Sequence, residues 1–388
     1  MKHAEHYDLI VVGSGALGAF HAYHALKAGL SVLLVEMDPR PRQATVRNFG
    51  QVVPSGMSGR WFNYGLRSTA IYSEIQQTTD ISVRNNGSVY IASNEDEVKL
   101  LHELKSIMDG RDYPTELLSK EACVRKWPVL NSSYCSEALF FPLEVSVEPD
   151  KMIFRVLAFL QEKFESLDYR PATTVVACTS AAQGVKVVTH TGDTFTGTKA
   201  IVCSGNEFRI LFPDHFRKSG IVVSKLHMVR TVPMPEVSLP GNILTGLTIR
   251  RYESFTECES FSALRTPEHL LELQKYGIHI LFKQATDGSI IIGDSHEYSE
   301  ANSLDPLDFS LSQYIQDIML AEAQRIVTFN TSLLATKWAG YYSQHPEKDI
   351  LELDISENIH VRTAIGGKGM TSAAGYSEQS IRKLFALD

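Results

Sequence analysis

The sequence predicts an α/β protein that combines a doubly wound parallel β-sheet with a second domain built on a mixed β-sheet. The first forty residues alternate strand, helix and strand around a glycine-rich turn, which is typical of a parallel sheet. The middle of the chain contains a β-hairpin pattern and other strands separated by helices. With 388 residues the chain exceeds the usual size of one compact core, so two domains are expected.

The first three elements follow from local sequence. Residues 7–12 (YDLIVV) form a β-branched run that is typical of a buried parallel strand. Residues 16–28 are predicted to form a helix whose small alanines can pack closely on a sheet, and Gly29 ends it. Residues 30–35 (LSVLLV) are predicted as a second buried strand, and Glu36 stands at its carboxyl end.

The turn after the first strand reads GSGALG, a GxGxxG motif. Gly13 permits the tight turn, Gly15 lets a pyrophosphate approach the backbone, and Gly18 lets the helix lie close to the strand. The free N–H groups at the helix start, around Ala16 and Leu17, stabilise phosphate charge. An isolated motif of this kind also fits a purely structural turn, but the complete strand, helix and strand order predicts dinucleotide binding.

Glu36 follows Gly18 by 18 residues, where its carboxylate can accept hydrogen bonds from a ribose diol. The same charge would repel a 2′-phosphate, which disfavours NADP. Met37 is expected to lie beside it at the cofactor. An NAD-dependent dehydrogenase remains open at this point, and a yellow purified protein would argue against it.

Composition excludes several other classes of protein. The chain is 44% apolar and 21% charged, with a net charge of −8, so a nucleic-acid partner is not expected. Five scattered cysteines without CxxC spacing predict neither a disulfide framework nor a metal site, and they fit a reducing cytoplasm. No apolar run is long enough to span a membrane, and the first seven residues lack the apolar core of a signal peptide. The oligomeric state stays open.

Segments after the first βαβ unit resemble the D-amino acid oxidase superfamily, with glycine oxidase and sarcosine oxidase as its nearest members. Residues 44–51 (ATVRNFGQ) resemble the loop that runs beneath the FAD pyrophosphate and along the isoalloxazine. Residues 147–150 (VEPD) resemble the entry to the helix, here 149–164, that precedes the adenine-contacting strand, here 174–178. The cofactor implied by this resemblance is FAD.

Two further segments extend the resemblance to the end of the chain. Residues 199–205 (KAIVCSG) resemble the late strand that ends against FAD, and 365–371 (IGGKGMT) resemble the G-x-S-G-H-G loop at the flavin pyrimidine edge. Residues 337–342 lack the cysteine that links flavin covalently in monomeric sarcosine oxidase, so non-covalent FAD is expected. The resemblance adds these cofactor-binding residues: Thr45, Arg47, Asn48, Phe49, Gly50, Val175, Val176, Cys203, Ser204, Gly205, Gly340, Gly366, Gly367, Lys368, Gly369, Met370 and Thr371.

The resemblance also implies that the chain forms two discontinuous domains. The FAD-binding domain is expected to comprise residues 1–81, 145–215 and 326–388, and the substrate domain 82–144 and 216–325. Sequence patterns predict the elements of the substrate domain: strands 87–92, 221–232, 278–282 and 289–293, a turn at Asp287-Gly288, and helices 95–108 and 307–329.

In the family the mixed sheet of the substrate domain covers the flavin. Polar residues on the strands predicted for this sheet are therefore candidates for catalysis. His279 and Lys283 lie on one strand with spacing that favours a shared face, and His296 follows the next strand. Lys368 replaces the histidine of the family loop, where its charge would stabilise reduced flavin, and Thr371 replaces a lysine of sarcosine oxidase. For each candidate the alternative is structural: a hydrogen-bonded histidine or a solvated lysine.

The oxygen-activating lysine of the family corresponds to Ile291 in this chain. Lys283 is the candidate substitute, and without one oxygen would be a poor electron acceptor. An anionic substrate is expected to bind through arginine, since the planar guanidinium matches carboxylate or phosphonate. The candidates are Arg47, Arg250 and Arg251 with Tyr252, and less strongly His227 and Arg230; a surface position is the alternative for each.

These features predict oxidation of the C–N bond of a small acidic amine to an imine, with oxygen as the default acceptor and peroxide as product. Residues 47–56, 250–258 and 284–296 also resemble a subfamily linked to phosphonate breakdown, which implies an aminophosphonate as one substrate class. The alternatives are a dehydrogenase that passes electrons to a carrier and a non-catalytic flavin-binding subunit. Peroxide production in air separates the oxidase from the dehydrogenase.

Overall fold

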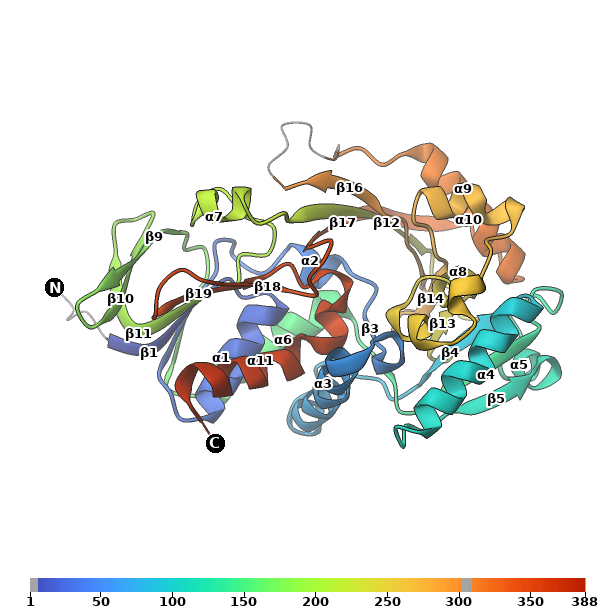
Figure 1. The fold of residues 1–388 in the computed structure, drawn as a ribbon, viewed down its shortest axis with the longest axis horizontal. Helices are drawn as coiled ribbons and strands as arrows, with labels where there is room; N and C mark the ends of the chain where they lie inside the picture. Colours follow the sequence, from blue (N-terminus) through green and yellow to red (C-terminus); the bar gives the residue numbers. More distant parts are fainter. Residues whose placement is uncertain (1–5, 302–306, 308, 388) are drawn as a thin grey trace.

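The computed structural model describes residues 6–301, 307 and 309–387, which form two large β-sheets side by side (Figure 1). The first sheet contains five adjacent parallel strands with an antiparallel strand, β18, at one edge. In spatial order these strands are β18 (Leu351–Asp354), β19 (Ile359–Thr363), β11 (Thr194–Val202), β1 (His6–Val12), β2 (Val32–Val35) and β8 (Leu167–Arg170).

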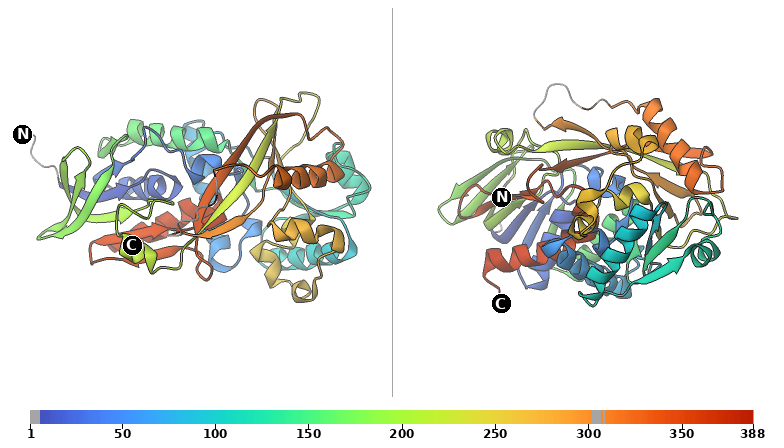
Figure 2. Two further views of the ribbon diagram at one scale, coloured as in Figure 1. Left: turned by 90° about the horizontal axis from the view of Figure 1, so that it is seen from above. Right: turned by 45° about the vertical axis from the view of Figure 1, so that its right-hand side comes forward.

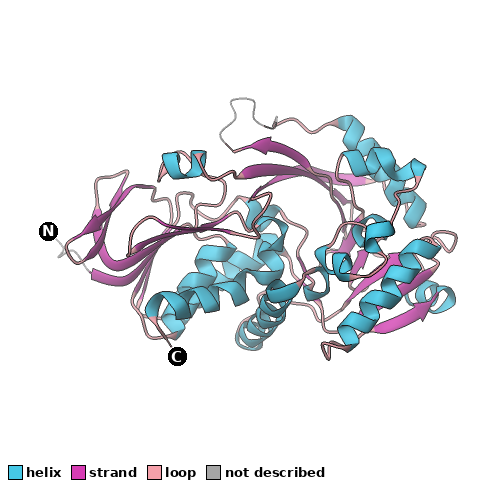
Figure 3. Ribbon diagram, in the orientation of Figure 1, coloured by secondary structure: helices cyan, strands magenta, loops and turns pink. Residues whose placement is uncertain are grey.

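Helices cover one face of this sheet and β-structure covers the other (Figure 3). Leu9 and Val11 of β1 pack against the helices, whereas Ile10 between them packs against the opposite layer, as the pleat requires. The helices are α1 (Ala16–Lys27), α3 (Gly59–Thr78), α6 (Pro149–Lys163) and α11 (Gly369–Phe385). The opposite face packs against β9 (Val175–Ala181) and β10 (Gly184–Thr189), which extend the same sheet because β10 pairs with β11, and against side chains from segment 205–221.

The second sheet has nine strands and is mixed. Strands β13 and β4 pair in parallel, and every other pair of strands in the sheet is antiparallel. Its long β12–β17 pair lies toward the middle of the molecule (Figure 2). In spatial order the strands are β16 (Glu297–Glu300), β12 (Val222–Thr231), β15 (Ile290–Gly293), β14 (Leu281–Gln284), β13 (Asn242–Leu244), β4 (Ser88–Ala92), β6 (Glu137–Phe141) and β5 (Glu116–Ser119), with β17 (Leu334–Gln344) also on β12.

Short elements join the two sheets. Helix α2 (Ala44–Arg47) contacts both α6 and β17, which places the predicted FAD loop between the sheets. The remaining elements are β3 (Gln51–Val52), β7 (Val145–Ser146), α4 (Glu95–Asp109), α5 (Lys120–Lys126), α7 (Pro213–Arg217), α8 (Gly246–Ile249), α9 (Leu271–Lys275) and α10 (Gln313–Ile326). Among the described residues, no helix combines the length and apolarity that a membrane span requires.

The predicted α/β class and mixed second sheet are confirmed, and the differences are local. Strand β14 begins three residues later than 278: Ile278 N still donates to Leu273 O of α9, although His279 and Asp294 exchange backbone hydrogen bonds just outside the paired strands. Helix α10 begins at Gln313 rather than 307, because Ser312 caps it by accepting a hydrogen bond from Ile315 N at 3.4 Å. Residue 308 of that predicted helix lies outside the described residues, as do residues 1–5 of the predicted N-terminal segment.

The strands of the first sheet lie within residues 1–81, 145–215 and 326–388, and those of the second sheet lie within 82–144 and 216–325, with β17 as the exception. This strand falls within 326–388, which was assigned to the FAD domain, yet it pairs along most of its length with β12 of the second sheet. Its carboxyl end is still paired with β12 at Ser343, whose hydroxyl also donates to Gly205 O next to the first sheet at 2.9 Å. The other domain limits remain predictions.

Candidate cofactor and active site

Two adjoining cavities lie between the carboxyl ends of the parallel strands and the second sheet. The larger has a volume of about 480 Å³ and the smaller about 140 Å³. Residues from the first βαβ turn, from helix α2 and from the end of β11 line both of them. These shared lining residues are Gly15, Ala44, Thr45, Cys203, Gly205 and Ser343.

The glycines of the first turn are required by close backbone packing. Gly13 has a φ of 97°, and a methyl group there would lie 2.4 Å from Cys203 O. A methyl group at Gly18 would lie 1.8 Å from Gly13 O, so α1 can approach β1 only without a side chain. Gly15 differs, because its nearest neighbour is the Thr45 hydroxyl at 3.1 Å and it borders both cavities. The three predicted roles therefore match three different environments.

Glu36 is fixed at the smaller cavity by hydrogen bonds that sequence analysis did not anticipate. Its Oε2 accepts from both Ser14 N and Ser14 Oγ at 2.9 Å, and its Oε1 accepts from Asp38 N at 3.1 Å. Met37 and Val175 line the same cavity. A buried carboxylate held by three donors is preorganised to accept further hydrogen bonds from a ribose diol.

The C-terminal loop forms one wall of the larger cavity. Gly366 has a φ of 59°, and the short turn Gly366–Lys368 leads directly into α11 at Gly369. The first turn of this 17-residue helix lines the cavity, so the positive end of its dipole faces the space inside. Such a wall suits the electron-rich edge of a reduced flavin.

Most predicted cofactor-binding residues line these cavities, and this is where we expect the cofactor. They are Gly13, Gly15, Ala16, Leu17, Glu36, Met37, Thr45, Asn48, Phe49, Gly50, Val175, Cys203, Ser204, Gly205, Gly366, Gly367, Lys368, Gly369, Met370 and Thr371. Asn48 shapes the loop, because its side chain donates to Thr45 O at 2.6 Å and accepts from Gly50 N at 2.8 Å.

Four residues of that predicted set lie elsewhere. Val176 alternates with Val175 along β9 and is 44% exposed. Gly340 allows β17 to pack on Arg47 O, which a methyl group would approach to 3.2 Å. Gly18 serves the packing of α1 described above. Arg47, predicted also to bind substrate, instead donates to the backbone at Arg42 O (2.8 Å) and Ala339 O (3.3 Å).

His279, Asp294 and His296 form a polar group in the wall of the larger cavity. His279 Nε2 lies 2.8 Å from Asp294 Oδ1, and His296 Nδ1 lies 3.8 Å from the same oxygen and 3.1 Å from Gly277 O. Burial lowers the pKa of His296 to about 3, so this ring is neutral at pH 7. Burial acts to raise the pKa of Asp294, but the two histidines outweigh it and lower that pKa.

The same three residues have the ligand spacing of a metal site, although none was predicted. Their ligand atoms lie within 4.8 Å of one another, an arrangement found at no other place in residues 6–301, 307 and 309–387. His279 Nε2 lies beside Asp294 Oδ1 and His296 Nδ1 is held by Gly277 O, although Asp294 Oδ1 is buried without a hydrogen bond of good geometry. We therefore interpret the group as a polar network whose carboxylate has unused hydrogen-bonding capacity.

The predicted substrate-binding cluster divides between the cavity and the core. Arg251 and Tyr252 line the cavity, where Arg251 donates to Tyr298 Oη at 3.1 Å and Tyr252 Oη accepts from Gln51 Nε2 at 2.5 Å. Arg250 is buried instead, with Nε 2.7 Å from Glu97 Oε1. Consecutive residues at the end of α8 point in different directions, and Arg250 is directed at α4.

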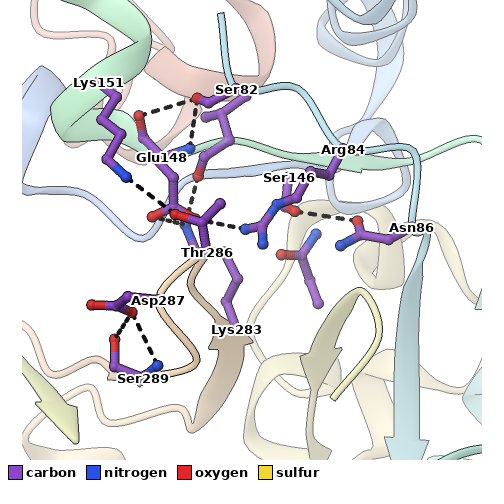
Figure 4. Close-up of polar contacts among 12 residues, drawn as sticks. Ser82, Arg84, Asn86, Ser146, Glu148, Lys151, Lys283, Thr286, Asp287 and Ser289 are labelled. Carbon is purple, nitrogen blue, oxygen red and sulfur yellow. Dashed lines mark hydrogen bonds and ion pairs between the residues drawn. The ribbon is translucent and has the colours of Figure 1, made fainter. Parts of the chain in front are cut away.

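Lys283 lines neither cavity but lies next to Glu148 (Figure 4). Its fully buried Nζ donates to Val147 O at 2.5 Å and lies 3.9 Å from Glu148 Oε2, and the other oxygen of Glu148 pairs with Arg84. A methyl group on Gly50, a cavity residue, would lie 2.6 Å from Nζ. Burial lowers the pKa of Lys283 to about 8. The alternative of a solvated lysine is therefore wrong.

Strand pairing explains this position. Lys283 on β14 faces Ile291 on β15, so the two side chains share one face of the sheet. Leu281, two residues earlier on that face, lines the larger cavity. Lys283 thus lies beside Ile291, the position at which the resemblance predicts a lysine. The backbone of Gly50 separates Lys283 from the cavity.

The other cationic candidates are paired with carboxylates. Lys368 lines the larger cavity, contacts Glu253, and lies 3.4 Å from Asp349 Oδ1, so its charge is largely balanced. Arg230 pairs with Asp287 at 2.9 Å and His227 with Glu297 at 3.0 Å, and neither lines a cavity. Among the cationic candidates, Arg251 is the cavity residue best placed to bind an anion.

Comparisons with known proteins agree with this geometry. A family model described as FAD dependent oxidoreductase matches residues 8–379. N-methyl-L-tryptophan oxidase of Yersinia pestis is 27% identical over 210 residues, which cover 53% of this chain and 56% of that protein. The chain thus matches about half the length of such curated relatives.

Two solved structures show the same fold at low sequence identity. L-proline dehydrogenase from P. horikoshii has a TM-score of 0.79 at 17% identity, covering 97% of this chain and 93% of its own. Glycine oxidase from Geobacillus kaustophilus has a TM-score of 0.76 at 17% identity, covering 99% and 95%.

Fold and site together define a dinucleotide-binding flavoprotein with a roofed active-site cavity. The chain belongs to the FAD-dependent oxidoreductase family that also includes D-amino acid oxidase, and FAD is its cofactor. The glycine turn and Glu36 would hold its pyrophosphate and ribose, and the first turn of α11 would face the flavin.

Proposed function

We propose that the protein oxidises the C–N bond of a small amine that carries an acidic group. The imine formed would be hydrolysed by water to a carbonyl compound and a free amine. Bound FAD supplies the acceptor for two electrons and a proton, taken as a hydride equivalent. The observation that carries the proposal is one cavity whose lining contains the residues predicted to face the flavin together with Arg251 and Asp294.

The residues of the chain bind and orient the substrate in this scheme. The guanidinium of Arg251 suits a carboxylate or phosphonate. Leu226, Leu281 and Phe49 provide apolar wall that excludes water near the reacting carbon. The similar proteins N-methyl-L-tryptophan oxidase and glycine oxidase are both named for amines with an acidic group, which supports this class. An aminophosphonate belongs to the same class, and the phosphonate-linked resemblance supports it.

Oxygen is the proposed acceptor, and a carrier-linked dehydrogenase is the second candidate. Ile291 favours the dehydrogenase, because a lysine is expected there in an oxidase of this family. The buried Lys283 beside it favours the oxidase, since its charge lies close behind the cavity wall. Non-covalent FAD is part of the proposal. The buried free thiols of all five cysteines support a reducing cytoplasm as the location.

Replacing Lys283 with methionine is expected to slow reoxidation of reduced enzyme by oxygen about tenfold, as loss of one charge across several ångströms of protein implies. The rate of anaerobic flavin reduction should stay unchanged. Because the pKa of Lys283 is about 8, wild-type reoxidation should also slow as pH rises through that value, and the variant should not. Stopped-flow mixing with oxygenated buffer measures both rates.

Lys151→Met is the matched control, because Lys151 lies in the same region but is exposed and bonded to Thr286 (Figure 4). Equal reoxidation rates in wild type and Lys283→Met would show that Lys283 has no role in the reaction of the reduced enzyme with oxygen.

The proposed function is tested by supplying the purified holoenzyme with a panel of amines in air and measuring peroxide and free amine together. The panel comprises glycine, sarcosine, other N-methyl amino acids and aminophosphonates. Equal amounts of peroxide and released amine from one acidic class support the oxidase. Product formed only with an artificial electron acceptor selects the dehydrogenase, and no product with any amine contradicts amine oxidation. Acid precipitation should release FAD into the supernatant.

A further inference from the structure

Asp294 places a buried carboxylate inside the cavity that, under the proposed function, receives the amine. Its side chain lines the larger cavity and the residue is only 6% exposed. One oxygen lies 2.8 Å from His279 Nε2. Burying an unpaired carboxylate is costly, so a charged group kept here needs favourable partners. The histidines provide part of this stabilisation, and an amine in the cavity would provide more.

His279 positions the carboxylate and is not itself free to bind an amine. Its Nε2 faces Asp294 and its Nδ1 lies 3.3 Å from Thr248 Oγ1, so both ring nitrogens have partners. His296 stacks on His279 with ring centroids 5.4 Å apart and is neutral. Both nitrogens of His279 are occupied, and His296, whose Nδ1 lies 3.1 Å from Gly277 O, is uncharged, so Asp294 is the anionic group of this network that can face a positively charged substrate nitrogen.

The walls near Asp294 suit a cation. Tyr252 and Tyr342 line the same cavity. Burial first, and then the charge of Asp294, raises the pKa of both phenols, so they stay neutral. Aromatic rings near a carboxylate attract positively charged nitrogen through their faces. Arg251 contributes the opposite charge to the same cavity, so the cavity matches a molecule with a cationic nitrogen and an anionic end.

We propose that Asp294 is the counter-ion of the substrate nitrogen, with His279 as the residue that positions it. As the carbon loses hydrogen with its bonding electron pair to FAD, the nitrogen lone pair forms the C=N bond and the nitrogen becomes positively charged. No proton moves in this step. The carboxylate stabilises the charge as it develops. It also attracts the protonated amine, which must release one proton to water before this step so that the nitrogen lone pair is free. This assignment rests on the proposed function.

The test compares two ligands of the same shape that differ in one charge. Glycine betaine carries a quaternary nitrogen where 3,3-dimethylbutanoate carries a carbon, and both have a carboxylate. Neither has a nitrogen lone pair, so neither is oxidised, and binding is measured by perturbation of the flavin absorption spectrum of the holoenzyme. Wild type is expected to bind betaine more tightly.

In Asp294→Asn, betaine affinity is expected to fall about 30-fold, as for loss of one partner from a buried charge pair. Affinity for 3,3-dimethylbutanoate should be unchanged or higher, and FAD should remain bound. Asp287→Asn is the matched control, because Asp287 lies on the turn of the same hairpin, is half exposed and faces Arg230 rather than the cavity. This control should keep the wild-type preference. Asp294→Glu, which keeps the charge, should retain a preference for betaine.

Equal affinity of the two ligands for wild type, or no binding of betaine, would overturn the proposal even if Asp294→Asn failed to fold. An equal loss of both ligands in the variant would also overturn it, as would betaine binding that disappears when EDTA removes a metal ion. The result for Asp294 can be distinguished from the result for the proposed function. Amines that reduce the flavin without a betaine preference leave the function intact, and a betaine preference without any amine oxidation leaves only the cation site.

Discussion

Replacing Arg250 with alanine is expected to lower the free energy of unfolding by about 4 kcal/mol, because it leaves a buried carboxylate unpaired. Arg250 and Glu97 have side-chain exposures of 4% and 0%, and Arg250 also donates to Arg265 O at 2.8 Å. Glu97 keeps only its bonds from Ser93 after the change. Urea denaturation followed by far-ultraviolet circular dichroism measures the effect.

The adjacent Arg251→Ala supplies the matched control for stability. It should change the unfolding free energy little, because Arg251 lies at the cavity and bonds only an exposed tyrosine hydroxyl. Instead, KM for the acidic amine should rise about tenfold or more, as loss of a charge-assisted hydrogen bond implies. If Arg250→Ala unfolds with wild-type stability, or if Arg251→Ala is the less stable variant, the division of this pair between core and cavity is wrong.

Replacing Gly15 with alanine is expected to weaken FAD binding about 100-fold while the protein stays folded. The added methyl group meets no backbone and only the Thr45 hydroxyl at 3.1 Å, but it enters the space that both cavities share. Holding the pyrophosphate away from the backbone removes the equivalent of one charge-assisted hydrogen bond, about 3 kcal/mol. Titration of apoprotein with FAD, followed by quenching of flavin fluorescence, gives the dissociation constant.

Gly110→Ala is the control for this glycine. Gly110 has ordinary helical dihedral angles at the end of α4, and a methyl group there makes only van der Waals contact. FAD affinity should not change. Wild-type FAD affinity in Gly15→Ala would mean that the pyrophosphate does not pass over this turn.

Sequence patterns predicted the parts of the protein that local chemistry determines. The first βαβ unit follows from a β-branched run, a glycine turn and a small-residue helix, and the structure places β1, α1 and β2 within two residues of the predicted limits. The hairpin at Asp287-Gly288 follows from its turn signal. These features depend on residues close in sequence, so no knowledge of tertiary packing was needed.

Side-chain direction was harder to predict because distant partners decide it. Arg47, Arg250 and Lys283 were reasonable cavity candidates by type, yet each finds a backbone carbonyl or a carboxylate from another element. The pairing of His279 with Asp294 brings together residues that lie just before β14 and just after β15, which alternation within a strand does not reveal. Glu97, the buried partner of Arg250, is an acidic residue in the first turn of α4. The sequence alone would predict an exposed side chain at such a position.

The central claim is that this chain uses FAD to oxidise a small acidic amine. The most direct measurement is the visible spectrum of the purified holoenzyme under nitrogen during stepwise addition of each amine of the panel. We expect an oxidised flavin band that one class of acidic amine bleaches in proportion to the amount added. A flavin band that no amine bleaches would contradict the amine chemistry, and the absence of a flavin band after reconstitution with FAD would contradict the cofactor assignment.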